Sequence, residues 1–424
     1  MVIIAVVLTV LALMGMPLFV VIAIGAMWGF YQSGVDLAVV AIEIFRIAEL
    51  PMLLAIPLFT FAGYILSESN APSRLVNLAQ TMCGWVPGGL GVVALTVCAF
   101  FTAFTGASGV TIVALGALLY PALRQGGYAE NFSLGLVTTS GSLGLLFAPS
   151  LPLILYGVVV QQLNVGPAVS IDQLFLAGIF PGLLMVAALV AWNCWINRHQ
   201  RQPLVEFSWR KVAVALRESL WELPLPIVVL GGIYSGSFAV SEAAAVTACY
   251  VVLVEVFILR EIPLRKLPEV MHRSMVLVGG ILIILGVSMA STNAMIDSGM
   301  PERLFRLVQT TVSDRLTFLL LLNLFLLLLG AVLDIFSALV LVVPLILPVA
   351  VGYGIHPVHL GIIFLANMQI GYLTPPVGMN LFIASYRFKR PISQLYRATL
   401  PFLFILLLCV ALITYVPQLS MGLL

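Results

Sequence analysis

Long apolar runs separated by short polar segments cover this chain from one end to the other. A helix needs about 20 consecutive apolar residues to cross the hydrocarbon core of a bilayer, and many of the runs reach that length. The runs occupy residues 2–31, 51–67, 88–121, 132–160, 174–197, 222–259, 274–298, 316–351, 358–386 and 398–418. The pattern therefore predicts an all-α polytopic membrane protein.

The composition supports this prediction. Of the 424 residues, 62% are hydrophobic and 8% are charged, whereas soluble proteins carry about 25% charged residues. The formal net charge is +2, and no basic stripe with interleaved aromatic residues occurs, which excludes nucleic acid as a partner. The first basic residue is Arg46, and the opening run is too long for a signal-peptide core. We therefore expect the chain to insert through its own first spans.

Some runs are long enough to enter the membrane and turn back. We interpret 88–121 and 316–351 as re-entrant helical hairpins, named hairpin 1 and hairpin 2. The run 222–259 is interrupted at Gly231-Gly232 and at Gly236, which indicates two crossings. The run 2–31 is interrupted at Gly15-Met16-Pro17, so the sequence leaves open whether it crosses once or twice.

Basic residues indicate which side of the membrane each loop occupies, because cytoplasmic loops carry an excess of Lys and Arg. Three basic clusters stand out: Arg198, Arg201, Arg210, Lys211 and Arg217; Arg260, Arg265, Lys266 and Arg273; and Arg387, Lys389, Arg390 and Arg397. All three can be cytoplasmic only if hairpin 1 opens from the cytoplasm and hairpin 2 from the opposite side. This is an inverted arrangement.

The two hairpin regions also resemble each other at a constant spacing. Four pairs of Gly or Pro residues lie 227 positions apart, namely Pro121 and Pro348, Gly127 and Gly354, Gly144 and Gly371, and Pro149 and Pro376. Recurring Gly and Pro mark recurring interruptions of the backbone. Together with the charge pattern, the spacing predicts two inverted-topology repeats of the kind found in secondary transporters.

Each repeat contains a hairpin tip and, after it, an interrupted helix. Tip 1 is predicted at 105–109 and break 1 at 138–150, while tip 2 is predicted at 330–337 and break 2 at 367–376. Backbone that leaves helical geometry inside a bilayer exposes carbonyl groups, which suit Na⁺, and helix N-termini, which suit an anion. We predict cation-binding residues Thr105, Gly106, Ser108, Ser140, Gly141, Asp334, Ser337, Gly371 and Thr374. We predict substrate-binding residues Ser108, Ser142, Pro149, Ser150, Pro375 and Pro376.

Two carboxylates and two histidines have competing interpretations. Asp334 is the one carboxylate within either hairpin, and it is expected to pair with a cation unless it merely caps a half-helix. Glu242 is interpreted as a helix-start carboxylate. His356 and His359 have a tempting spacing for a metal, but no carboxylate that could support them lies nearby.

Other functional classes fit less well. Gly106-Ala107-Ser108-Gly109 resembles the motif of intramembrane serine proteases, but all four histidines fall in loops or at span ends, so no base accompanies Ser108. A channel would need rings of ligands from a symmetric oligomer. A transporter that works without a binding protein also remains open. No Walker-type Gly-x-x-x-x-Gly-Lys sequence occurs, which argues against ATP as the energy source.

Several stretches resemble the large membrane subunit of tripartite ATP-independent periplasmic (TRAP) transporters, along essentially the whole chain. They are Ala103 to Gly109, Gly141 to Ser150, Ser235 to Ala245, Asp334, Pro344 to Pro348, and most specifically Gly371 to Leu381. The chain departs from that pattern in hairpin 1, which has fewer serines, and in break 1, which reads Ala-Pro-Ser in place of a double proline.

The resemblance implies a sodium-coupled importer of an organic anion in the inner membrane, with no cofactor besides Na⁺ and no enzymatic activity. It also implies a small membrane subunit, a periplasmic solute-binding protein that delivers substrate, and an elevator movement. No Lys or Arg lies in the tips or breaks, so the substrate cannot be read from the sequence. The expected division is 1–87 scaffold, 88–160 transport domain, 161–315 linking and scaffold helices, 316–386 transport domain, and 387–424 a C-terminal membrane helix.

Overall fold

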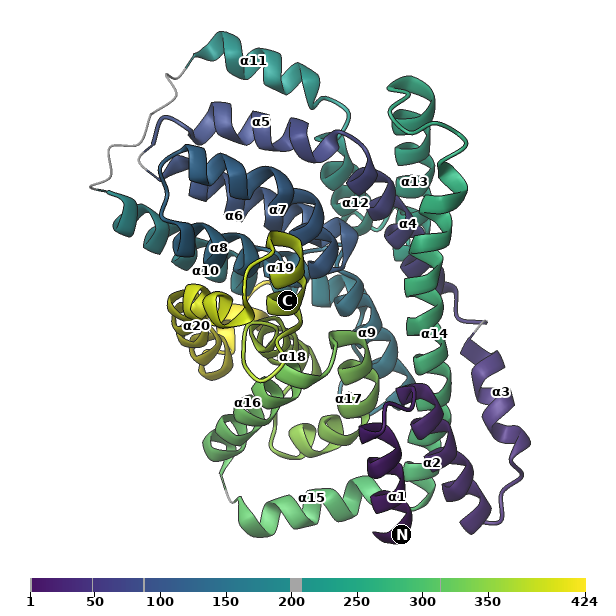
Figure 1. Ribbon diagram of the computed structural model, residues 1–424. Helices are drawn as coiled ribbons and strands as arrows, with labels where there is room; N and C mark the ends of the chain where they lie inside the picture. Colours follow the sequence, from purple (N-terminus) through teal and green to yellow (C-terminus); the bar gives the residue numbers. More distant parts are fainter. Residues whose placement is uncertain (1, 48, 87, 199–207, 313) are drawn as a thin grey trace.

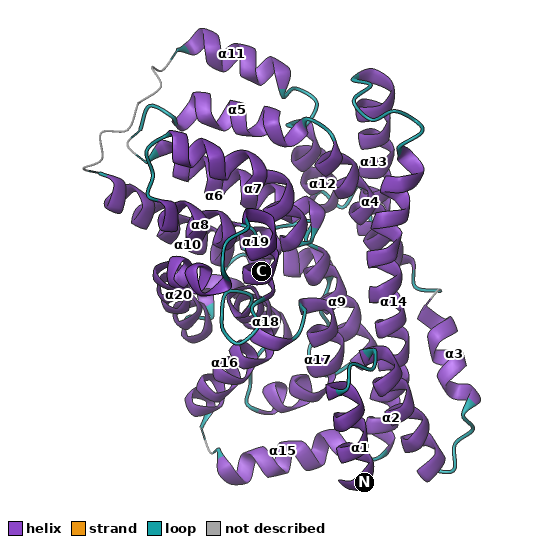
Figure 2. Cartoon of the chain, in the orientation of Figure 1, coloured by secondary structure: helices purple, strands orange, loops and turns teal. Residues whose placement is uncertain are grey.

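The computed structural model describes residues 2–47, 49–86, 88–198, 208–312 and 314–424 (Figure 1). Throughout these ranges the regular elements are helices (Figure 2). Eight helical stretches in them are long and apolar enough to cross a membrane. The all-α polytopic prediction is therefore confirmed.

The helices follow one another with short connections. The first part of the chain forms α1 Val2–Leu13, α2 Leu18–Gln32, α3 Ala38–Ile47, η1 Pro51–Leu54, α4 Ala55–Glu68, α5 Ala71–Cys83, α6 Gly89–Thr105, α7 Ser108–Gln125, α8 Glu130–Ser140, η2 Leu143–Leu146, α9 Leu151–Leu163 and α10 Ile171–Asn197. The second part forms α11 Trp209–Glu218, α12 Pro224–Tyr234, α13 Val240–Val252, η3 Leu253–Ile258, α14 Leu267–Asp297, α15 Met300–Thr311, α16 Arg315–Val332, α17 Ile335–Gly352, α18 Pro357–Gly371, α19 Met379–Phe388, α20 Ile392–Tyr415 and α21 Gln418–Met421.

The repeat predicted from Gly and Pro spacing recurs in the helix boundaries. Helices α7 and α17 begin at Ser108 and Ile335 and end at Gln125 and Gly352, so both ends differ by 227 positions. Helices α8 and α18 begin at 130 and 357, which gives the same difference. The amphipathic helices α5 and α15, which precede the two hairpins, lie at opposite ends of the molecule (Figure 1). The repeats are therefore inverted.

Each hairpin turns over two residues. At tip 1, Gly106 ends α6 in the left-handed region with φ +64°, and its N–H donates to the Thr102 carbonyl. At tip 2, Leu333 and Asp334 are extended, and α17 starts directly after them. The four hairpin helices have 17 or 18 residues, and each pair returns to the side from which it entered, so both hairpin predictions are confirmed.

The long run 222–259 forms two helices, and its interruption lies at the second of the two predicted positions, around Gly236 (φ +70°). Gly231 and Gly232 are inside α12, and the chain leaves helical geometry between Tyr234 and Val240. A Gly pair lowers helix propensity without ending a helix when neighbouring helices hold the segment in place. The prediction of a break at Gly231-Gly232 is therefore wrong. The run 2–31 is broken at 14–17, where the sequence had left the question open.

The predicted cytoplasmic residues gather around one end of the molecule. Glu68, at the end of α4, pairs with Lys266 (2.8 Å) and Arg273 (3.0 Å), and Arg390 pairs with Glu130 (2.7 Å) at the open end of hairpin 1. Helix α11, which carries Arg210, Lys211 and Arg217, packs on α5 at the same end (Figure 1). Arg201 lies outside the described residues. The grouping agrees with a cytoplasmic opening of hairpin 1.

An ionic cluster anchors α5 to the helices behind it. The Arg74 guanidinium donates to Glu222 (2.7 Å from Nε), to Glu255 (3.2 Å) and to Glu261. Glu222 and Glu255 are almost fully buried. Removing one member of such a cluster would leave uncompensated buried charge, so the cluster fixes α5 firmly in place.

The same close contact holds each break against its hairpin. In repeat 1, a Cβ added at Gly144 would lie 2.5 Å from the Ala103 nitrogen, and in repeat 2 one added at Gly371 would lie 2.6 Å from the Gly330 Cα. Ala103 and Gly330 are also 227 positions apart. The recurring glycines therefore mark two equivalent backbone contacts between a break and the first helix of its hairpin.

We expect Gly144→Ala and Gly371→Ala to lower stability by roughly 1–3 kcal/mol each, because the added methyl group would press on backbone that cannot move aside. Gly280→Ala is the matched control, since a Cβ there meets nothing within 4 Å and should be neutral or slightly stabilising. Thermal unfolding of the purified variants in detergent measures the difference. Equal melting temperatures for all three variants would show that the breaks are not packed as described.

Candidate functional site

The two tips and two breaks meet in the interior of the helix assembly. Most of the predicted site hydroxyls are buried there, namely those of Thr105, Ser108, Ser140, Ser142, Ser150 and Ser337. Buried hydroxyls must find hydrogen-bond partners or ligands. Their partners show which predicted residues join a tip to its break, which join the two repeats, and which bond only within their own segment.

The first group joins tip 1 to break 1. The Thr102 hydroxyl, one turn before the tip, donates to the Gly141 carbonyl (2.9 Å) and lies 2.7 Å from the Thr111 hydroxyl. Helices α6 and α8 end at Thr105 and Ser140, so their C-terminal carbonyl groups are brought to the same place. Helix C-termini carry partial negative charge and favour a cation.

The second group joins tip 2 to break 2. Asp334 caps α17, and its Oδ1 accepts the N–H groups of Phe336 and Ser337 at 3.0 Å each. The Ser337 hydroxyl donates to the other carboxylate oxygen. In break 2, the Tyr372 hydroxyl accepts the N–H of Ile335 at 2.7 Å. Asp334 therefore caps α17, and it remains partly exposed.

Two contacts join one repeat to the other. The Ser108 hydroxyl in tip 1 donates to Asn380 Oδ1 at 2.7 Å. The Ser142 hydroxyl in break 1 lies 3.3 Å from the Gln369 carbonyl in break 2, and these two residues are 227 positions apart. A contact between equivalent residues lies on the two-fold axis that relates them. The approximate axis of the repeats therefore passes between the two breaks.

The remaining predicted residues do not converge on a common point through their side chains. The hydroxyls of Ser140, Ser150 and Thr374 each donate to a carbonyl three to five residues earlier, and that of Thr105 lies 3.5 Å from the Ala107 carbonyl. Pro149 and Pro376 each follow a cis peptide bond. Pro149 is buried, whereas Pro375 and Pro376 are exposed, so the two breaks differ in accessibility.

Sequence reasoning missed several residues of this region. They are Thr102, Thr111, Gln369, Tyr372 and Asn380. Asn380 had one available signal, since it is the one polar side chain in the apolar segment Val377–Ala384 directly after break 2. Thr102, Thr111 and Gln369 lie within apolar helices, where a single hydroxyl or amide usually serves helix packing, and Tyr372 directly follows the end of α18.

Neighbouring polar residues have structural roles. Glu242 Oε2 accepts the N–H of Ala239 (2.9 Å), which confirms its interpretation as a helix-start carboxylate. His359 Nδ1 lies 2.6 Å from the Ser420 hydroxyl, and His356 accepts the N–H of Val358 at 3.2 Å. Ser108 contacts an amide where a serine nucleophile would need a base. The geometry thus offers a protease no catalytic pair.

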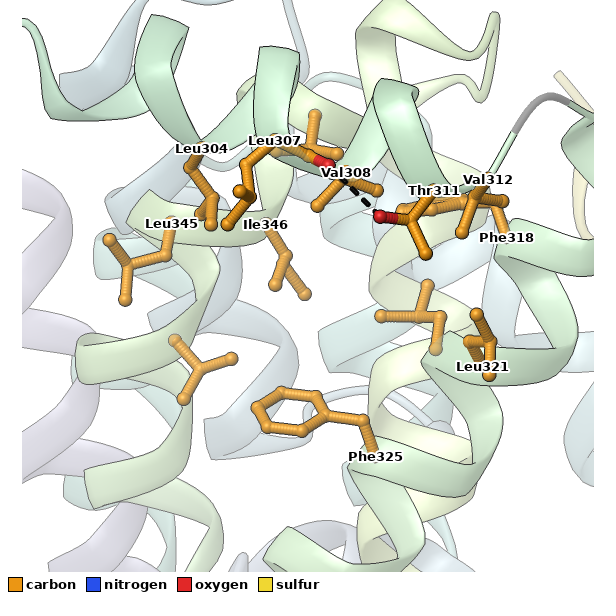
Figure 3. A pocket seen from close by; sticks show the side chains of 13 residues that line it. Leu304, Leu307, Val308, Thr311, Val312, Phe318, Leu321, Phe325, Leu345 and Ile346 are labelled. Atoms are coloured by element: carbon orange, nitrogen blue, oxygen red, sulfur yellow. Dashed lines mark hydrogen bonds between the residues drawn. The ribbon is translucent and has the colours of Figure 1, made fainter.

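A large apolar cavity lies away from the tips and breaks. It measures about 530 Å³ and lies between α15, α16 and α17. Figure 3 shows that Thr311 is the polar residue of its lining, and that its hydroxyl is directed at the Leu307 carbonyl (3.4 Å). The other lining residues are apolar. A charged substrate would find no partner there, so the tips and breaks remain the candidate site.

Comparisons with known proteins agree with this geometry. Residues 2–419 match the family model described as tripartite ATP-independent periplasmic transporter, DctM component. The chain is 35% identical to the C4-dicarboxylate TRAP transporter large permease protein DctM of Rhodobacter capsulatus, over 97% of this chain and 96% of the relative. It is 33% identical to the sialic acid TRAP transporter large permease protein SiaM of Vibrio cholerae, over 87% of this chain and 85% of the relative.

Among solved structures, the YdaH transporter of Alcanivorax borkumensis has a similar fold. The TM-score is 0.64 with 12% sequence identity, over 89% of this chain and 86% of that one. At this identity the likeness concerns the fold alone.

Proposed function

The chain belongs to the DctM component family of tripartite ATP-independent periplasmic transporters, and from that membership we propose that it imports a small organic anion by sodium-coupled transport. It is a multi-pass inner membrane protein and a transporter permease subunit, not an enzyme. The coupling ion, the substrate and the movement described below extend this family assignment.

Sodium coupling is supported chiefly by the paired helix C-termini. Carbonyl oxygens and hydroxyls are hard ligands of the kind that Na⁺ prefers in transporters with broken helices. A first cation site would use oxygens of Thr105, Gly106, Ser108, Ser140 and Gly141, around the meeting point of α6 and α8. A second would use Asp334, Ser337, Gly371 and Thr374, where a carboxylate adds full negative charge.

An organic anion is supported by the helix N-termini and by the relatives. The relatives are named for C4-dicarboxylates and for sialic acid, and both substrates carry a carboxylate. Ser108, Ser142, Pro149, Ser150, Pro375 and Pro376 are the residues we propose to surround it. With no Lys or Arg in the tips or breaks, the substrate charge would be balanced by Na⁺ and by helix dipoles.

Partners and movement follow from the same family assignment. TRAP membership implies a small membrane subunit and a periplasmic binding protein. We propose that the binding protein delivers the substrate, and that residues 88–160 and 316–386 move together as a transport domain. The scaffold would comprise 1–87 and 161–315, with 387–424 as a C-terminal membrane helix. The inverted repeats support this elevator movement, since exchanging the conformations of the two halves exchanges access from one side to the other.

Uptake should be driven by sodium without ATP. Proteoliposomes that contain this chain, its small subunit and its binding protein are expected to accumulate radiolabelled succinate, or else sialic acid, when an inward Na⁺ gradient is applied. Potassium in place of sodium should reduce accumulation to background. Uptake that persists without sodium and collapses with a proton ionophore would assign the coupling to H⁺.

Asp334→Asn should raise the sodium concentration needed for half-maximal uptake roughly 10-fold, because it removes one charged ligand while keeping a capping side chain. Asp314→Asn is the matched control. Asp314 caps α16 of the same hairpin, and the N–H of Thr317, which donates to it at 2.8 Å, lowers the pKa of its carboxyl. This control should leave the sodium dependence unchanged. An identical sodium dependence for Asp334→Asn and wild type would reduce Asp334 to a helix cap.

The tips should change their aqueous accessibility during transport. Single cysteines at Ser108 and Ser337, in a variant without the five native cysteines, are expected to react with membrane-impermeant reagents from one side under sodium and from the other side when substrate is added. A cysteine at exposed Lys211 on α11, which packs on α5 outside the proposed transport domain, should label equally in both conditions. Constant labelling of both tips would contradict an elevator movement.

A further inference from the structure

The repeat places two equivalent pairs of helix N-termini in the site. Helix α7 packs against α19, and helix α17 packs against α9. The first pair is in close contact, since Ser108 and Asn380 are the first and second residues of α7 and α19 and are joined by the 2.7 Å hydrogen bond. The N–H groups of a first helical turn have no partner within the helix and carry partial positive charge.

Charge distinguishes the two pairs. In the α17 pair, the Asp334 carboxylate accepts the first N–H groups of α17 and supplies a fixed negative charge. The equivalent position before α7, 227 residues earlier, is Ala107. The N-cap residues of α7 and α19 are Ala107 and Gly378, and neither makes a side-chain capping bond. The positive ends of α7 and α19 are thus uncompensated by any side chain that caps them.

Asn380 adds a free donor at the same place. Its side chain is 0% exposed. Its Oδ1 accepts the Ser108 hydroxyl, and its Nδ2 has no hydrogen-bond partner among the described residues. A buried donor without a partner is costly and is usually explained by a ligand that the site receives. A donor calls for an acceptor, so this amide is suited to an anion and unsuited to Na⁺.

We infer that Asn380 and Ser108, at the N-termini of α7 and α19, form the subsite that binds the carboxylate group of the transported anion. The inference rests on the proposed function for the existence of such a substrate, and it assigns the anion to one of two equivalent places. Asp334 would repel an anion from the other pair and reserve that place for a cation.

One fixed carboxylate subsite also agrees with the substrates named for the two relatives described above. C4-dicarboxylates and sialic acid differ in size and shape but share the carboxylate. A subsite made of helix N-termini and one amide recognises that group alone and leaves the rest of the molecule to other surfaces. Specificity would then depend on residues around the subsite rather than on Asn380.

Charge-selective labelling tests the inference without any substrate. Cysteine replaces Ser108 in one variant and its repeat equivalent Ile335 in another, after the five native cysteines are removed. Each is treated with methanethiosulfonate reagents that carry either a sulfonate or a trimethylammonium group. At each cysteine, the labelling rate with the sulfonate reagent is divided by the labelling rate with the trimethylammonium reagent. This ratio should be about 10-fold higher at position 108 than at position 335, because opposite local charges favour opposite reagents.

A second variant tests whether the charge at the residue before α7 determines the labelling ratio. Adding Ala107→Asp to the Ser108→Cys background reproduces the charge of tip 2 and should lower the ratio toward that of Ile335→Cys. The inference would be overturned if the ratios at positions 108 and 335 were equal. It would also be overturned if the sulfonate reagent failed to label position 108 at every sodium concentration. Neither result depends on sodium coupling or on the identity of the substrate, so the proposed function is tested separately.

Transport kinetics give the second measurement. Asn380→Asp and Asn380→Ala are compared in the complete transporter with radiolabelled succinate, or with sialic acid if succinate is not taken up. Asn380→Ala should raise the KM roughly 10-fold, and Asn380→Asp further, with the half-maximal sodium concentration unchanged. Thermal unfolding in detergent confirms that each variant folds. An unchanged KM in both Asn380 variants would overturn the inference.

Discussion

The structure depends on one constraint, that backbone polar groups within a bilayer must be satisfied by the protein itself. A continuous helix meets it at once, whereas a helix that stops inside the membrane does not. Here α6, α8, α16 and α18 all stop inside the assembly. The ends of α6 and α8 meet through the Thr102 hydroxyl on the Gly141 carbonyl, and the end of α16 is covered by the N–H of Gly378, just before α19, on the Ala331 carbonyl at 3.0 Å. Helix-terminal carbonyl groups without a protein partner are suited to bind a cation, and helix-terminal N–H groups without one are suited to bind an anion.

The inverted repeat makes the arrangement of helix ends nearly symmetric. The two halves differ in the charge of the residue before the second hairpin helix. Gly144 and Gly371 keep the same close contact in both halves, so the backbone is shared. Asp334 and Ala107 occupy the same place with different charge. Inverted halves allow access to alternate between the two sides. Under the proposed function, the different charges would let the two halves bind different ions.

Sequence patterns predicted the backbone better than the side chains. Gly and Pro act locally, so their spacing placed the tips, the breaks and the repeat, with the exception of Gly231-Gly232, which neighbouring helices hold within α12. Hydrogen bonds between segments carry no such local signal. Asn380 meets Ser108 across 272 positions, and nothing near either residue indicates the other. The predicted hydroxyls of Ser140, Ser150 and Thr374 instead bond to nearby carbonyls, which composition alone cannot foresee.

The two amphipathic helices that precede the hairpins are held in opposite ways, and this bears on how the halves could move. Helix α5 is fixed by charge, since Arg74 binds carboxylates from the turn before α12, from η3 and from the loop that follows η3. Helix α15 lies instead against hairpin 2, where its Phe305 ring meets Tyr353 edge-on with ring centroids 6.0 Å apart, and the Tyr353 hydroxyl donates to the Val312 carbonyl at 2.6 Å. Buried ion pairs are costly to break, because separation leaves uncompensated charge, whereas apolar and aromatic contacts can slide with little change in energy. In the proposed elevator movement, helix α5 would therefore stay with the scaffold while hairpin 1 moves past it, and α15 would adjust its position as hairpin 2 moves.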